Sequence, residues 1–184
     1  MVGNGRRMRI GIGMLAGLFA ASALAHGDGK SKFDTRLVGY EETPSTINSP
    51  ASGEFSLKIS KDGSSIDYKL TYRDMPTSVT QSHIHCGRPA LTGGIVLFLC
   101  TNLTPPAGVP TPPLCPTPGG TVTGTLTAAD IIAQAGQSID AGANGFAQVV
   151  KAVRNGAAYA NVHTTGHASG EIRGALGDPD DDDD

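Results

Sequence analysis

Four of the five histidines of this chain lie in two short segments, SHIHCG and NVHTTGH. The first segment contains His83 and His85, and the second contains His163 and His167. Residues i and i+2 of a strand point to the same face, so His83 and His85 project together if their segment is extended. Neutral imidazoles are ligands that suit copper and zinc. If the two segments are neighbouring strands, the sequence predicts a site for one such ion at these four histidines.

The same histidines also have an interpretation without a metal. Histidines at strand ends can hydrogen-bond to loop carbonyl groups or accept backbone amides. The sequence does not show whether SHIHCG and NVHTTGH pair with one another. A metal requires the rings of His83 and His163 to meet at one point, so the distance between them separates the two interpretations.

Other catalytic arrangements find little support in the residues. The chain has no G-x-S-x-G motif, which disfavours a serine nucleophile. Glu41 and Glu42 are adjacent and face apart, which disfavours the paired carboxylates of a glycosidase. Glu171 and Arg173 share one strand face, where we expect an exposed ion pair that contributes little to stability.

The segments that carry these residues belong to a series of short strands. Apolar and polar residues alternate in FDTRLVGY, GEFSLKIS and IDYKLTYR, as in strands with one buried face. Lys61–Ser64, between the second and third of these, is typical of a hairpin turn. Five further strands are predicted in TQSHIHCG, GIVLFLC, TVTGTLT, AAYANVHT and GEIRGAL. Eight strands at short intervals predict an all-β fold, an antiparallel Greek-key sandwich or barrel.

Two short helices are predicted between the sixth and seventh strands. The first covers AADIIAQAG, with Thr127 as its cap and Asp130 in the capping-box position. The second begins after Asn144 and ends at Asn155-Gly156. Its apolar face is expected to consist of Phe146, Val149, Val150 and Val153.

The first 25 residues have the pattern of a signal peptide. Arginines precede an apolar run from Ile10 to Phe19, and Ala23-Leu24-Ala25 offers small residues for cleavage. We therefore expect an exported protein, secreted or periplasmic, that begins at His26 and has no stable membrane insertion after cleavage. The expected organisation is a signal peptide (1–25), a flexible N-terminus (26–31), one domain (32–177) and an acidic disordered tail (178–184).

The charge of the chain is concentrated at its end. Six of the seventeen acidic residues lie in the final segment DPDDDDD. Without this tail and the three arginines of the signal, eleven basic and eleven acidic residues remain. A neutral body without a basic patch disfavours nucleic acid as a partner.

Three cysteines in an exported chain predict one disulfide and one free thiol. Cys100 and Cys115 flank a proline-rich loop, where a bridge would stabilise the fold by about 3 kcal/mol. Cys86 lies beside the histidines and could be a buried apolar residue, a metal ligand or the true partner of Cys100. The residues alone leave this pairing open.

The motifs VGYEETP, SHIHCG, LTAADI and YANVHTTGHASGEIRGAL resemble those of the CHRD domain, named for its occurrence in chordin. The resemblance spans roughly Lys32 to Leu176, and the members that the chain resembles are bacterial, single-domain and exported. Many of these members carry a cysteine pair at the positions of Cys100 and Cys115. The resemblance therefore implies a disulfide between these two residues.

The CHRD domain has been proposed to resemble, distantly, the Greek-key barrel of copper/zinc superoxide dismutases. That likeness implies copper ligands at His83, His85 and His163. It also makes Arg173 similar to the arginine that guides superoxide. No histidine lies between the two histidine-containing segments, so the bridging histidine and the zinc-loop ligands of the dismutases are absent.

These observations favour an exported, non-enzymatic binding or structural module of unknown ligand that holds one copper or zinc ion through its histidines. One alternative is a copper-dependent oxidoreductase of superoxide-dismutase type, which rests on likeness of fold alone. The other is a metal-free protein-interaction domain with an extracellular partner. An oxidoreductase needs an open coordination position, whereas a closed site with four ligands is structural.

Overall fold

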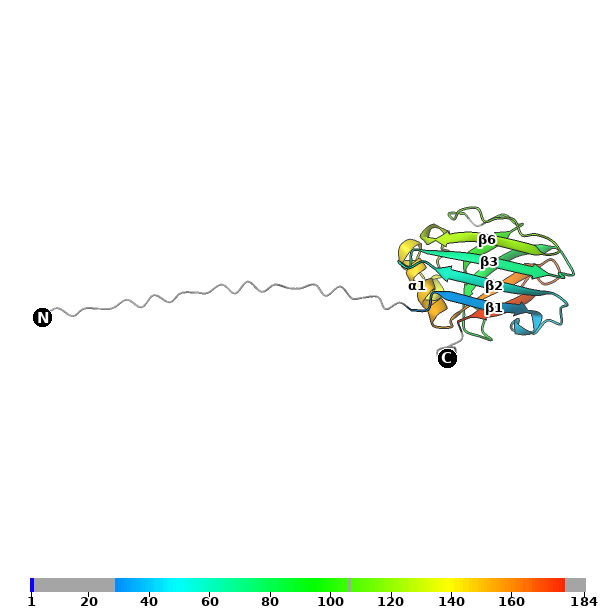
Figure 1. Cartoon of the computed structure of the whole chain (residues 1–184), viewed down its shortest axis with the longest axis horizontal. Helices are drawn as coiled ribbons and strands as arrows, with labels where there is room; N and C mark the ends of the chain where they lie inside the picture. Colours follow the sequence, from blue (N-terminus) through cyan, green and yellow to red (C-terminus); the bar gives the residue numbers. More distant parts are fainter. Residues whose placement is uncertain (2–28, 106, 178–184) are drawn as a thin grey trace.

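The computed structural model describes residues 1, 29–105 and 107–177 (Figure 1). Beyond Met1, the predicted signal peptide lies outside these ranges, as does the predicted acidic tail. Eight antiparallel strands confirm the all-β prediction. They are β1 (Lys32–Val38), β2 (Ser52–Ile59), β3 (Ser65–Arg73), β4 (Val79–Cys86), β5 (Gly94–Thr101), β6 (Gly120–Thr127), β7 (Ala158–Thr164) and β8 (Ile172–Leu176).

The strands form one sheet that curls into a nearly closed barrel, in the order β5-β4-β7-β8-β1-β2-β3-β6. Figure 1 shows β1, β2, β3 and β6 as one wall of the barrel, with helix α1 (Gly142–Arg154) at one end. The chain crosses to distant strands after β3 and after β6, as a Greek-key path requires. The Tyr68 hydroxyl of β3 donates to the Leu99 carbonyl oxygen of β5 at 2.6 Å, which links the two ends of the sheet where the barrel nearly closes.

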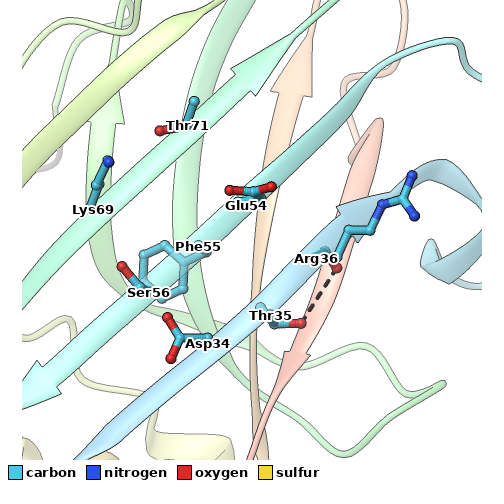
Figure 2. A pocket seen from close by; sticks show the side chains of 8 residues that line it. All are labelled: Asp34, Thr35, Arg36, Glu54, Phe55, Ser56, Lys69 and Thr71. Carbon is cyan, nitrogen blue, oxygen red and sulfur yellow. Dashed lines mark hydrogen bonds between the residues drawn. The ribbon is translucent and has the colours of Figure 1, made fainter.

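The wall of β1, β2 and β3 follows the predicted alternation of side chains. Phe55, Leu57 and Ile59 of β2 point into the core and are buried, and the residues between them are polar. Figure 2 shows the outer face of this wall, where charged side chains such as Glu54 and Lys69 stand on neighbouring strands. One buried face and one solvated face are what alternating sequences produce.

Strands β4 and β7 differ because both of their faces are covered. All seven residues of β7 are buried, and so are the last five residues of β4. Ile84 and Val162 are fully buried on the core side. The other face carries the histidines beneath the loops that follow β4 and β7. Because these loops cover it, the second face of each strand is buried as well.

The two predicted helices have different outcomes. Helix α1 begins at Gly142, three residues before the expected start, and buries the four apolar residues predicted for its face. The segment AADIIAQAG forms instead a 3-10 turn, η2 (Ala128–Asp130), with the predicted capping box of Thr127 and Asp130. Beyond it the Ile132 amide donates to the Val96 carbonyl oxygen at 3.0 Å. This hydrogen bond to β5 holds the backbone extended and overrides the local helical preference.

The structure contains a disulfide between Cys100 and Cys115. It joins the end of β5 to the far end of the proline-rich loop, the position that the family resemblance implies. Cys86 is a free, buried cysteine at the end of β4. No helix within the described ranges is both long and apolar enough to cross a membrane.

Candidate metal centre

The two histidine-rich segments form adjacent antiparallel strands. In the register of β4 and β7, His83 lies opposite Asn161 and Gln81 lies opposite His163. Residues that face each other across antiparallel strands share one face of the sheet, and so do residues i and i+2. The register therefore places His83, His85 and His163 on the same face.

Three of the four predicted ligands come together. One ring nitrogen from each of His83, His85 and His163 lies within 4.8 Å of those from the other two. His83 Nδ1 is 3.1 Å from His163 Nε2. His167 is not in this group and lies in the turn after β7, where its amide donates to Thr164 Oγ1 at 3.1 Å. The turn does not swing the His167 ring back toward His163.

Backbone carbonyl groups orient two of the three rings. Nδ1–H of His85 donates to the Gly93 oxygen at 2.9 Å, and Nδ1–H of His163 donates to the Ala168 oxygen at 3.0 Å. A carbonyl oxygen can only accept, so in each neutral ring Nε2 carries a lone pair. Metal-binding histidines are commonly held by this kind of second contact. His85 and His163 are thus oriented to offer Nε2 to a metal ion.

Asn161 brings an oxygen atom to the same point. Its Oδ1 lies 3.1 Å from His85 Nε2 and 3.0 Å from His163 Nε2. With both rings neutral, these three atoms are all acceptors. Nδ1–H of His83 can supply one hydrogen, to His163 Nε2. The remaining lone pairs repel one another in a buried setting, and a cation between them removes that repulsion.

One ring nitrogen of His83 faces away from this cluster. This atom, Nε2, is buried and has no hydrogen-bond partner within the part of the chain that the structure describes. The ring of Phe98 packs edge-on against the His83 ring, with centroids 4.3 Å apart. Buried polar atoms without partners are rare in native proteins and call for an explanation.

Burial keeps the three rings neutral. The exposed fractions of His83, His85 and His163 are 0%, 6% and 5%. Loss of water lowers the pKa of His83 to about 2, and repulsion from His163 and His85 adds to this effect. Burial also lowers the pKa of His85 to about 4, against the opposing effect of its hydrogen bond to Gly93, and lowers the pKa of His163. The neutral imidazole is the form that binds a metal.

Arg173 does not form the exposed ion pair with Glu171 that the sequence predicts. It is 2% exposed, and its guanidinium donates to Thr43 Oγ1 at 2.6 Å and to the carbonyl oxygens of Arg88 and Leu91 at 3.2 and 2.8 Å. The loops that precede β2 and follow β4 cover the strand face that we expected to be open. With its donors engaged inside the fold, Arg173 does not stand free to guide an anion.

Glu171 is equally buried and has different partners. The hydroxyl groups of Ser49 and Thr164 each donate to one of its carboxylate oxygens at 2.6 Å. The carboxylate therefore joins the loop before β2 to the end of β7. The ion-pair prediction is wrong for this residue as well, because loop residues far away in sequence supply its hydrogen-bond donors.

Glu42 is a second buried carboxylate near Arg173. Burial raises its pKa to about 7, although the positive charge of Arg173 and a backbone hydrogen bond from Thr43 act in the opposite direction. Its Oε1 has no hydrogen-bond partner among the described residues. The carboxylate packs against Gly170, where an added Cβ would lie only 2.5 Å from Oε1.

Sequence reasoning did not include Asn161 among the site residues. A signal was present, because N-x-H in NVH has the same spacing as H-x-H in HIH and places the two side chains on one face. Gly93 and Ala168 could not have been found in this way. They act through backbone carbonyl groups, which every residue possesses.

Comparison with known proteins identifies the family. The CHRD domain model matches residues 33–176, which is most of the chain. Neither the search of curated proteins nor the search of solved structures found a match. The matched residues include all eight strands but the first residue of β1, together with the three clustered histidines. The chain belongs to the CHRD domain family.

Proposed function

We propose that this protein is an exported CHRD-domain module that binds one copper or zinc ion through His83, His85 and His163. The observation that carries the proposal is the convergence of ring nitrogens within 4.8 Å in a buried, neutral setting. The Nδ1 atoms of His85 and His163 are engaged by backbone carbonyl groups, so their Nε2 lone pairs face the centre. Imidazole ligands of this kind suit zinc and copper in preference to magnesium or calcium.

Without a metal, the side-chain amide of Asn161 would have to take the reversed orientation. If the amide is reversed, Nδ2 takes the place of Oδ1 and can donate to the Nε2 atoms of both His85 and His163. The two acceptors would then be satisfied without an ion, and the buried Nε2 of His83 lacks a partner among the described residues in either arrangement, because Nδ1 is the His83 atom that faces the cluster. Metal binding accounts for the lone pairs of all three rings, and we favour it for that reason.

Burial favours a module over an enzyme. A copper oxidoreductase must admit its substrate to an open coordination position. None of the three rings is more than 6% exposed, and the donors of Arg173 are engaged by loop oxygens. These features support a bound ion that does not meet a substrate.

The test is metal content of the purified full-length protein, measured by mass spectrometry after exposure to zinc or copper and removal of excess ion. We expect about one ion per chain. We expect a His83→Ala/His85→Ala variant, shown to be folded by circular dichroism, to retain none. A wild-type protein that retains neither ion would overturn the proposal and favour a metal-free interaction domain.

The disulfide supports export, because such bonds persist in oxidising compartments. We propose that the mature protein is secreted or periplasmic and begins at His26. Mass spectrometry of the protein recovered outside the cytoplasm would show this N-terminus. An intact mass that includes residues 1–25 would contradict cleavage at this point. We also propose that the module has an extracellular partner.

A further inference from the structure

We infer that Asn161 is the fourth ligand of the metal, through Oδ1, and that it closes the coordination sphere. This inference rests on the proposed metal site and specifies its role. A closed site with four protein ligands holds the ion as a structural link between β4 and β7 and leaves no position for a substrate.

The strand register brings the Asn161 side chain to the histidines. Asn161 lies directly opposite His83 and two residues before His163, so its side chain shares their face. The backbone carbonyl oxygen of Asn161 accepts a hydrogen bond from the Ser82 hydroxyl at 2.6 Å, which anchors this part of β7 to β4. The residue is 2% exposed. A short, anchored and buried side chain of this kind has little freedom to turn away from the site.

The distances between the donor atoms suit a four-coordinate ion. Bonds of about 2.0 Å to a tetrahedral zinc place the ligand atoms about 3.3 Å apart. Asn161 Oδ1 is 3.1 Å from His85 Nε2 and 3.0 Å from His163 Nε2, and His163 Nε2 is 3.1 Å from His83 Nδ1. Shifts of a few tenths of an ångström would bring these three of the six separations to the tetrahedral value, and the histidine nitrogens, which lie within 4.8 Å of one another, would close further around the ion.

The four donors of this site are all uncharged. Three neutral imidazoles and one amide oxygen carry no charge, so a divalent ion would bring its full charge into the interior. Glu42 and Glu171 are buried carboxylates of the same region, but the group of candidate ligands found among the described residues includes neither. The side-chain oxygen of Asn161, which lies beside the Nε2 atoms of His85 and His163, is therefore the candidate for the fourth ligand.

Cobalt(II) and azide give a direct test of a closed site. Cobalt replaces zinc in tetrahedral sites and shows intense visible bands when it is four-coordinate, and azide shifts these bands when it occupies an open position. We expect the cobalt-loaded full-length protein to show the four-coordinate spectrum and to be unaffected by azide. We expect Asn161→Ala to bind cobalt about 10- to 100-fold more weakly and to acquire a spectral response to azide.

Asn161→Asp is the matched variant, because it keeps an oxygen at the same position. It should restore metal affinity and remain insensitive to azide. An azide response in the wild-type protein would overturn the inference even if Asn161→Ala fails to fold, and so would an Asn161→Ala variant that binds cobalt with unchanged affinity and spectrum. In both cases the metal site itself would stand, whereas absence of cobalt from the wild type would refute the proposed function.

Discussion

The ring of Tyr159 stacks on the ring of His85, with centroids 4.6 Å apart and planes 5° from parallel. Arg173 approaches the same tyrosine from the neighbouring strand, with its Cζ 3.4 Å from the ring centroid. The Tyr159 hydroxyl accepts the Gly93 amide at 3.2 Å, and the Gly93 carbonyl in turn accepts Nδ1–H of His85. Tyr159 thus holds one histidine of the candidate site both through its ring and through its hydroxyl group.

The buried guanidinium of Arg173 is expected to be a main contributor to stability. Arg173→Lys removes the planar group that packs on Tyr159 and reaches three oxygens from two loops. Loss of these hydrogen bonds in the interior should lower the free energy of unfolding by about 3 kcal/mol. Urea unfolding measures this difference. Arg36→Lys, at an exposed position of β1, is the control and should change little; equal effects of the two substitutions would contradict the role of Arg173.

His163 and His167 provide a matched pair for the metal site. His163 belongs to the cluster and His167 does not. Zinc should raise the melting temperature of the wild type and of His167→Ala, because an ion that binds the folded state stabilises it. The same zinc should leave the melting temperature of His163→Ala unchanged. A loss of the zinc effect in His167→Ala would mean that the turn after β7 moves to bring this fourth histidine into the site.

The raised pKa of Glu42 predicts that the free energy of unfolding decreases as pH rises. The folded protein holds this proton up to a pKa of about 7, whereas the ordinary value is 4.5. Between these values the unfolded chain releases the proton first, so the free energy of unfolding falls as pH rises, by about 3 kcal/mol in total. Glu42→Gln should lack this decrease and should therefore be more stable than the wild type near pH 8.

Glu41→Gln is the control for this experiment, since the neighbouring Glu41 is exposed. Urea unfolding at several pH values should give a difference between wild type and Glu42→Gln that grows from pH 4.5 to pH 7. Contributions from the histidines are common to both proteins and cancel in this difference. If the free energies of unfolding of wild type and Glu42→Gln changed in parallel with pH, folding would not raise the pKa of Glu42, and the prediction would be wrong.

The state of the cysteines can be read with a thiol reagent. Cys86 is buried, and burial raises the pKa of its thiol to about 11, so little reactive thiolate is present at neutral pH. We expect no reaction in the native protein and one thiol per chain after unfolding without reductant. Cys86→Ser should abolish the reaction in the unfolded protein. A remaining thiol in this variant would mean that Cys100 and Cys115 are not paired.

Prediction from the sequence succeeded where one local pattern was sufficient. Local sequence patterns identified all eight strands, three of them through clear alternation, and the capping residues Thr127 and Asp130 were assigned correctly. Prediction failed for the first helix and for the exposed ion pair of Glu171 and Arg173, because contacts with segments distant in sequence determine the structure there. A hydrogen bond to β5 extends the segment after η2, and loops cover the outer face of β8.

The sequence by itself determined the periodicity of each strand, and with it that His83 and His85 share one face and that Asn161 and His163 share one face. These relations depend on neighbours in the chain, through the two-residue repeat of extended backbone. Only the tertiary structure decided that β4 and β7 are adjacent, and that their register brings these faces together. It also decided that loops bury the site and that the turn after β7 leaves His167 outside it. Strand order and loop packing depend on contacts between residues about 80 positions apart, such as His83 and His163, which no local pattern encodes.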